Sequence, residues 1–139
     1  TGIKQVVISF NAVSTSGTSK KLIRLGDVTT GVVTGGYVSN SHSIIEATAA
    51  AYNPAAAGFG INSIDATARL HGSVILTLEN STTFRWSASG VLCDVQAANS
   101  TFTVSGSVPL GNVLDRIRIT TANGTDTFDV GEVNIAYSS

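Results

Sequence analysis

The residues of this chain that could carry nucleophilic or acid–base chemistry are two histidines, one cysteine and many hydroxyls. There are 17 serines and 17 threonines, but a hydrolase triad also needs a histidine and an exposed nucleophile turn. His42 lies in a polar, alternating stretch and His71 stands beside Gly72 at a predicted turn, and no Gly-x-Ser-x-Gly motif accompanies either. We interpret both as surface or turn residues and predict that the protein is not an enzyme.

Metal ligands are equally sparse. Cys93 is the only cysteine, which excludes an intramolecular disulfide and a zinc site built from several cysteines, and we expect it to be a small buried residue. Asp126 and Asp129, with Asn123 and Thr125, could gather oxygen ligands for calcium, but alternation along a strand puts the two carboxylates on opposite faces unless a bulge intervenes. We interpret these side chains as turn-forming, and predict no metal and no cofactor.

The charge balance limits the partners of the protein. Its formal net charge is −1, so it lacks the surplus of cations that binding to nucleic-acid phosphates requires. A long uncharged stretch, residues 47–64, consists mainly of alanine and glycine and is interrupted by Pro54, so we predict no membrane-spanning segment.

A surface for cell-surface glycan remains open as an alternative function. Sugar binding needs an exposed aromatic ring with a few polar groups beside it, and the candidate rings are Tyr37, Tyr52 and Phe59. Packing of these rings on their own sandwich is the competing interpretation. A glycan hydrolase with paired carboxylates is a second alternative, although no pair among the six aspartates and three glutamates is singled out by the sequence.

Runs of β-forming residues separated by glycine, asparagine, aspartate and serine make up nearly all of the chain, and helical periodicity is almost absent. We predict a single all-β domain over residues 1–139, folded as a two-sheet antiparallel β-sandwich of about ten strands, with a jelly roll as the arrangement. Residues 46–61 lose the alternation and are predicted to form the longest irregular loop, with one helical turn. The predicted strands cover residues 3–10, 21–25, 28–34, 37–45, 64–70, 73–78, 83–87, 91–95, 101–104, 116–120 and 127–137.

Three side-chain placements follow from the period of two in strands. Phe84 and Trp86 should lie in the core, with Arg85 pointing outward. Arg116 and Arg118 should share one face of a strand, and we name them as candidate assembly contacts. Asn123 and Gly124 are a preferred pair for a two-residue hairpin, whose return strand would bring Asp126, Asp129 or Glu132 within reach of an arginine.

The end of the chain, residues 113–137, contains Asp-Arg-hydrophobic-Arg-hydrophobic-Thr-Thr, then Asn-Gly-Thr-Asp, Phe-Asp, Gly, Asn-Ile and Tyr. This pattern resembles a C-terminal module of virion-surface proteins of tailed bacteriophages, often tail-fibre or other structural proteins. Residues 76–90, a strand and turn leading to Trp86, look like the same family. The resemblance covers less than half of the chain, and Ala122 stands where such modules often have valine.

The resemblance implies a structural virion protein, located in the tail, the tail fibre or the capsid surface, with no catalytic residues to transfer. Its expected partners are other virion proteins and further copies of itself, a trimer among the options, and host-surface glycan if the domain is distal. The sequence contains no methionine, so the chain has either lost its initiator or is a fragment.

Overall fold

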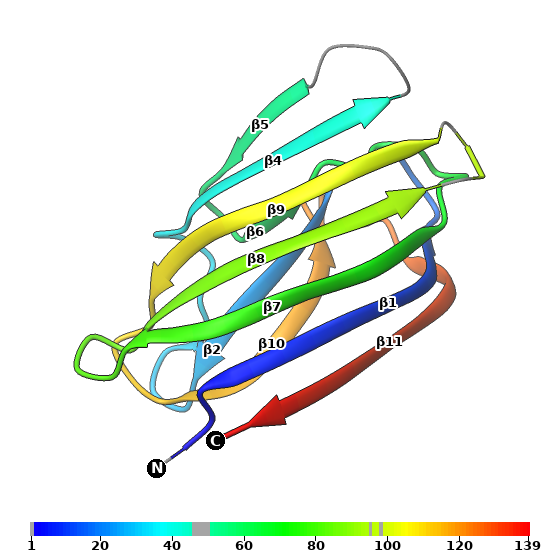
Figure 1. The fold of residues 1–139 in the computed structure, drawn as a ribbon. Coiled ribbons are helices and arrows are strands. Elements are labelled where there is room, and N and C mark those ends of the chain that lie inside the picture. The colour runs from blue at the N-terminus through cyan, green and yellow to red at the C-terminus, as the bar shows by residue number, and fades with distance from the viewer. Residues whose placement is uncertain (1, 46–50, 95, 98) are drawn as a thin grey trace.

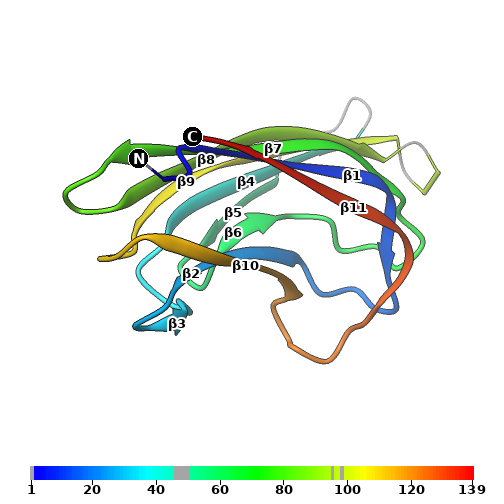
Figure 2. The same ribbon diagram turned by 90° about the horizontal axis from the view of Figure 1, so that it is seen from below.

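The computed structural model describes residues 2–45, 51–94, 96–97 and 99–139, with the side chains of residues 51–53 left out of the description. The predicted β-sandwich is confirmed: two antiparallel sheets lie face to face (Figures 1 and 2). The strands are β1 (Gln5–Thr15), β2 (Lys21–Asp27), β3 (Gly31–Val32), β4 (Val38–Ile45), β5 (Ala51–Ala55), β6 (Phe59–Ile61), β7 (Leu70–Asn80), β8 (Arg85–Asp94), β9 (Ser100–Pro109), β10 (Leu114–Thr121) and β11 (Phe128–Ser138).

The sheets are of unequal width. The larger one has seven strands in the order β11-β1-β7-β8-β9-β4-β5, and the smaller one has the order β10-β2-β3, with β6 also pairing with β2. The wide sheet therefore extends beyond the small one. The jelly-roll arrangement stays a prediction.

The core fills the space between the two sheets. Alternate residues of the central strands point inward, as in β1, where Val6, Ile8 and Phe10 are buried. Trp86 of β8 is the largest fully buried side chain, as predicted. Arg85 lies on the other face and donates from Nη1 to Ser107 Oγ at 3.2 Å. Phe84 is half-buried and lies in the turn before β8 with a φ of 49°, so it packs on the edge of the core and the predicted strand start is too early.

Two of the predicted irregular regions belong to strands. Residues 51–55 and 59–61 of the predicted long loop form β5 and β6, while residues 46–50, with most of the predicted helical turn, lie outside the described residues. Pro54 fits in β5 because this strand forms one edge of the wide sheet, where a missing N–H breaks no ladder. The predicted turn at His71 and Gly72 is wrong as well, since both lie inside β7 and the backbone of Val91 approaches Gly72 too closely for a side chain.

The predicted hairpin at Asn123 and Gly124 is a turn between sheets. Gly124 has a φ of +71° and its N–H donates to Thr121 O at 3.1 Å, so the turn itself exists. However, β10 belongs to the small sheet and β11 to the wide one, and the segment between them crosses the gap (Figure 2). The two strands that the sequence pattern pairs do not pair with one another.

Candidate functional site

One side of the sandwich, formed by the neighbouring edges β10 and β11, is open. The pairing register puts Val133, Ile135 and Tyr137 of β11 opposite Phe10, Ile8 and Val6 of β1, so these three side chains share the inward face. The β1 residues are buried, whereas Val133, Ile135 and Tyr137 are 36%, 49% and 71% exposed. The inner face of the wide sheet therefore continues past the cover that the small sheet provides.

A groove follows this open side between the two sheets. It has a volume of about 220 Å³ and is lined by Ile3, Val6, Leu114, Ile117, Ile135 and Tyr137, with Asp115 and Arg116 at its polar border. The lining is predominantly apolar, which is unusual for a surface that remains in water. This groove and the exposed apolar residues of β11 (Phe128, Val130, Val133, Ile135 and Tyr137) are named the open side below.

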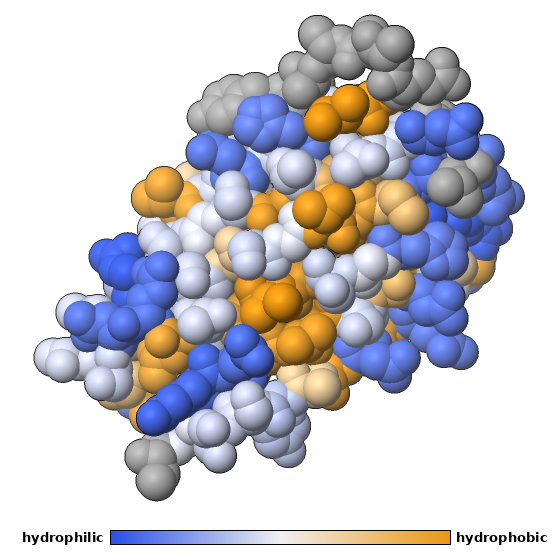
Figure 3. All heavy atoms as spheres, viewed as in Figure 1, coloured by the Kyte–Doolittle hydropathy of each residue, from blue (hydrophilic) through white to orange (hydrophobic). Residues whose placement is uncertain are grey.

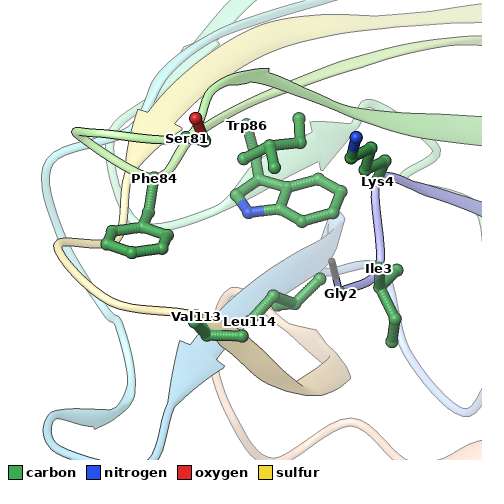
Figure 4. A pocket seen from close by; sticks show the side chains of 9 residues that line it. Gly2, Ile3, Lys4, Ser81, Phe84, Trp86, Val113 and Leu114 are labelled. Carbon is green, nitrogen blue, oxygen red and sulfur yellow. The ribbon is translucent and has the colours of Figure 1, made fainter. Parts of the chain in front are cut away.

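A smaller pocket adjoins the groove, sharing Ile3 and Leu114 with it, and is shown in Figure 4. Its volume is about 190 Å³, below the size of most ligand pockets. The ring of Trp86 forms its inner wall, with Phe84 and Lys4 on either side (Figure 4). Trp86 Nε1 is buried without a hydrogen-bond partner among the described residues.

The two arginines proposed as assembly contacts lie on one strand face, as predicted. Ile117 and Ile119 are opposite the buried Leu25 and Ile23 of β2, which puts Arg116 and Arg118 on the outer face of the small sheet, where both are exposed. Arg118 lies opposite Arg24, a pairing of like charges.

The predicted ion pairs with Asp126, Asp129 or Glu132 are not found among the described residues, because those acids belong to the turn and strand that cross to the other sheet. The expectation that at least one arginine is paired holds, with a different partner. Arg116 Nε donates to Asp115 Oδ1 at 2.6 Å, and Nη2 donates to Oδ2 at 2.9 Å. This bidentate contact lowers the pKa of Asp115 and raises that of Arg116, and both groups lie in water.

Two of the three candidate glycan contacts are core residues, so the expectation of an exposed platform is wrong for them. Tyr37 and Phe59 are 4% and 0% exposed and pack edge to face at 5.1 Å between ring centroids. Tyr37 Oη accepts from Leu25 N at 2.8 Å, and burial raises the pKa of this phenol. The alternative interpretation, packing on the sandwich itself, applies to both rings. The side chain of Tyr52 lies outside the described residues.

The residues considered for chemistry or metal binding are dispersed. His42 lies in β4 beside Thr103, and His71 lies in β7 opposite Cys93. Cys93 is exposed, against expectation, because Leu92 and Asp94 take the inward positions of β8. Among the residues that the structure describes, no three histidine, cysteine or acidic side chains gather as a metal site.

The acidic turn around residue 126 is held by its own hydrogen bonds. Asn123 Oδ1 accepts from the N–H groups of Thr125 and Asp126, each at 3.1 Å. Asp126 accepts from Asn123 Nδ2 at 2.8 Å and from Ser19 N at 2.9 Å, and these bonds lower its pKa. The interpretation of these side chains as turn-forming is confirmed for Asn123 and Asp126.

A pocket of about 280 Å³ lies away from the open side, and its lining includes two carboxylates, Asp65 and Asp94. Asp94 is buried, and its oxygens accept from the N–H groups of Arg69, Gln96 and Ala97. Asp65 Oδ1 accepts from the N–H and hydroxyl of Thr67, and these bonds lower its pKa. Both acids are thus engaged in holding turns, and the lowered pKa of Asp65 is the opposite of what a general acid requires.

Sequence reasoning missed the burial of a lysine, alongside that of Asp27 and Asp94. Lys21 is 1% exposed and donates from Nζ to Ser63 O at 3.0 Å. Burial lowers its pKa, while Asp126, Asp65 and Asp129 oppose that shift. The alternation of β2 could not reveal this burial, because every residue of the strand except Arg24 is buried, on both faces.

A second apolar area lies on the outer face of the wide sheet. Figure 3 shows apolar atoms near the middle of that face with hydrophilic residues around them. Ile75 and Val91 are 38% and 58% exposed, and Val7 lies opposite Ile75 in the register. These side chains stand among serines and threonines and are separated from the open side by the thickness of the sheet.

Comparison with protein-family models, with curated proteins and with solved structures finds no match to this chain. In the described part of the chain, no helix has the length and apolar character needed to cross a membrane.

Proposed function

We propose that this domain is a non-catalytic structural module of a tailed-bacteriophage particle, in the tail, tail fibre or capsid surface, that assembles with neighbouring virion proteins. The observation that carries the assembly part is the open side, where an apolar groove and an 11-residue strand with exposed apolar side chains stand at a sheet edge. Uncovered apolar area of this kind is typical of surfaces that bind another protein. The virion part rests on the resemblance of residues 113–137.

The hydrogen-bond arrangement supports a rigid scaffold rather than a reactive centre. The carboxylates of Asp65, Asp94 and Asp126 each accept two or more hydrogen bonds from nearby turns. Arg116 and Arg118 remain candidate contacts for orienting the module, because two exposed guanidinium groups on one face can pair with carboxylates of a neighbour.

Cross-linking mass spectrometry on purified particles tests this proposal. Lys4 lies at the end of the open side near Ser138 and is exposed, so a lysine-reactive cross-linker should join it to a second virion polypeptide. Recovery of the chain in purified particles with such cross-links is the expected result. A chain that is absent from particles and remains in the supernatant of the lysate overturns the virion assignment.

Glycan binding remains the alternative, and of the three rings only Tyr52 can still serve as a platform. A glycan array with the parent chain and Tyr52→Ala tests it. Binding that disappears in the variant would favour this alternative over a purely structural role.

A further inference from the structure

We infer that the outer edge of β11 pairs antiparallel with the same edge of a second copy, with Ile135 opposite Ile135 at the two-fold axis. This inference rests on the proposed function, because it names the partner that covers the open side. This pairing joins the wide sheets of two copies into one continuous sheet and buries Val133, Ile135 and Tyr137 of both copies.

The first argument is that this edge of the wide sheet is unprotected. Proteins commonly block sheet edges with proline, charge or a bulge. The opposite edge, β5, contains Pro54, and the edge of the small sheet, β10, contains Asp115, Arg116 and Arg118. In β11, residues 133–138 contain neither proline nor a charged side chain. Among the described residues, no strand pairs with that outer edge.

The second argument is that the free backbone groups and the apolar side chains belong to the same residues. Leu78 N donates to Lys4 O, so the carbonyl of Lys4 faces β7, and from Gln5 onward the odd residues of β1 direct their backbone groups toward β11 and the even ones toward β7. The register pairs the odd residues of β1 with Ala136 and Asn134. The N–H and C=O groups of Val133, Ile135 and Tyr137 therefore face the free edge.

These positions set the register of the pair. With Ile135 at the axis, Val133 of each copy lies opposite Tyr137 of the other, which makes three consecutive apolar cross-strand pairs. Glu132 then lies opposite Ser138 and away from the Glu132 of the second copy. Opposite Gly131, whose φ is 93°, β1 carries the extra residue of a bulge and the register shifts, so the regularly paired region is residues 132–138.

Charge favours a second copy over an unrelated strand. The charged residues of β11, Asp129 and Glu132, are both acidic and lie in its first half. Cationic Lys4 lies toward its end, where Lys4 N donates to Ser138 O, whereas the charge of Arg116, which borders the groove beside Tyr137, is paired with Asp115. Antiparallel pairing about a two-fold axis brings the acidic end of each copy to the cationic end of the other.

The test measures the mass of the 139-residue chain in solution by analytical ultracentrifugation. The expected result is a dimer for the parent and a monomer for Ile135→Pro, whose missing N–H lies on the outer edge and not in the β1 ladder. Circular dichroism establishes that the variant is folded. Should it not fold, Tyr137→Lys replaces it, because this 71% exposed side chain is outside the core, and it should weaken the dimer at least tenfold. A parent that is monomeric at hundreds of micromolar, or that has the mass of three chains, overturns the inference.

Chemical cross-linking then tests the register. In a Cys93→Ser background, Ile135→Cys should give a cross-linked dimer with a short bismaleimide, whereas Thr77→Cys, an exposed residue of the interior strand β7, should give only the collisional background. Equal yields overturn the pairing. If the chain is monomeric alone but is cross-linked to other proteins in particles, the inference fails and the proposed function stands. If the chain dimerises through β11 but is absent from particles, the inference stands and the proposed virion function fails.

Discussion

Ile8 and Ile135 occupy the same register position on neighbouring strands, yet Ile8 is 0% exposed and Ile135 is 49% exposed. The difference arises from the small sheet, because its strands β10 and β2 cover the side chain of Ile8 but do not extend over β11. Burying a side chain of this type fully contributes about 1.5–3 kcal/mol. The open side thus keeps in water a set of side chains whose burial would favour association, which is the physical basis of the proposed assembly.

Removal of the central ring should destabilise the domain strongly. Trp86→Ala leaves a cavity under the middle of the wide sheet and should lower the free energy of unfolding by about 3–5 kcal/mol. Trp86→Phe should cost clearly less, because it keeps most of the ring and removes the buried N–H that lacks a partner. Urea denaturation of both variants checks the order. Equal stability of the parent and Trp86→Ala would place the ring outside the core.

Two glycines with positive φ should respond differently to alanine. The carbonyl of Ala12 lies against the position where a Cβ of Gly131 would stand, whereas a Cβ on Gly124 would meet no atom within 4 Å. Gly124→Ala should therefore cost only the strain of a left-handed residue, about 1–2 kcal/mol. Gly131→Ala adds a backbone clash and should cost more. Thermal melts compare the two, and a larger loss at Gly124 would contradict the bulge geometry.

The buried Lys21 should make the free energy of unfolding depend on pH in the alkaline range. Because the pKa of Lys21 is lowered in the folded state, the unfolded chain binds more protons between the folded pKa and the unfolded value of about 10.5. The free energy of unfolding should therefore rise with pH across that interval. Lys21→Met should show a smaller rise. If the free energy of unfolding changes with pH in the same way for the parent and the variant, Lys21 has the same pKa in the folded and the unfolded state.

Neutralising the exposed arginines should affect assembly and leave the fold intact. Both side chains are exposed and Arg116 bonds only its neighbour Asp115 among the described residues, so the double variant Arg116→Gln, Arg118→Gln should melt close to the parent. Its incorporation into particles should be weaker, and more so at low salt, where charge pairing is least screened. Equal incorporation at all salt concentrations would show that the arginines are only a solvated face.

Local patterns predicted much of this fold because side-chain alternation reports burial directly. A period of two predicts the inward Trp86, the outward Arg85 and the placement of the arginines and isoleucines of β10 on opposite faces. The same rule, applied to β8, would have placed Cys93 outside. A general preference of free cysteine for the interior predicted the wrong face.

Strand pairing and the open side could not be predicted from the sequence. Asn123 and Gly124 do form a turn, but whether the following strand returns to the same sheet depends on contacts of β11 with β1, more than one hundred residues earlier in the chain. The alternation of β11 looks like that of any half-buried strand. Its exposure results from the narrowness of the small sheet, a tertiary property that no local pattern contains.

Amide hydrogen exchange along β11 tests the central claim that this strand is the docking edge. In dilute solution the amides of Asn134 and Ala136, which face β1, should be protected, and those of Val133, Ile135 and Tyr137 should exchange rapidly. On assembly, the second group should become protected while the first remains as it was. If Val133, Ile135 and Tyr137 exchange equally fast in the dilute and the assembled protein, β11 is not the docking edge.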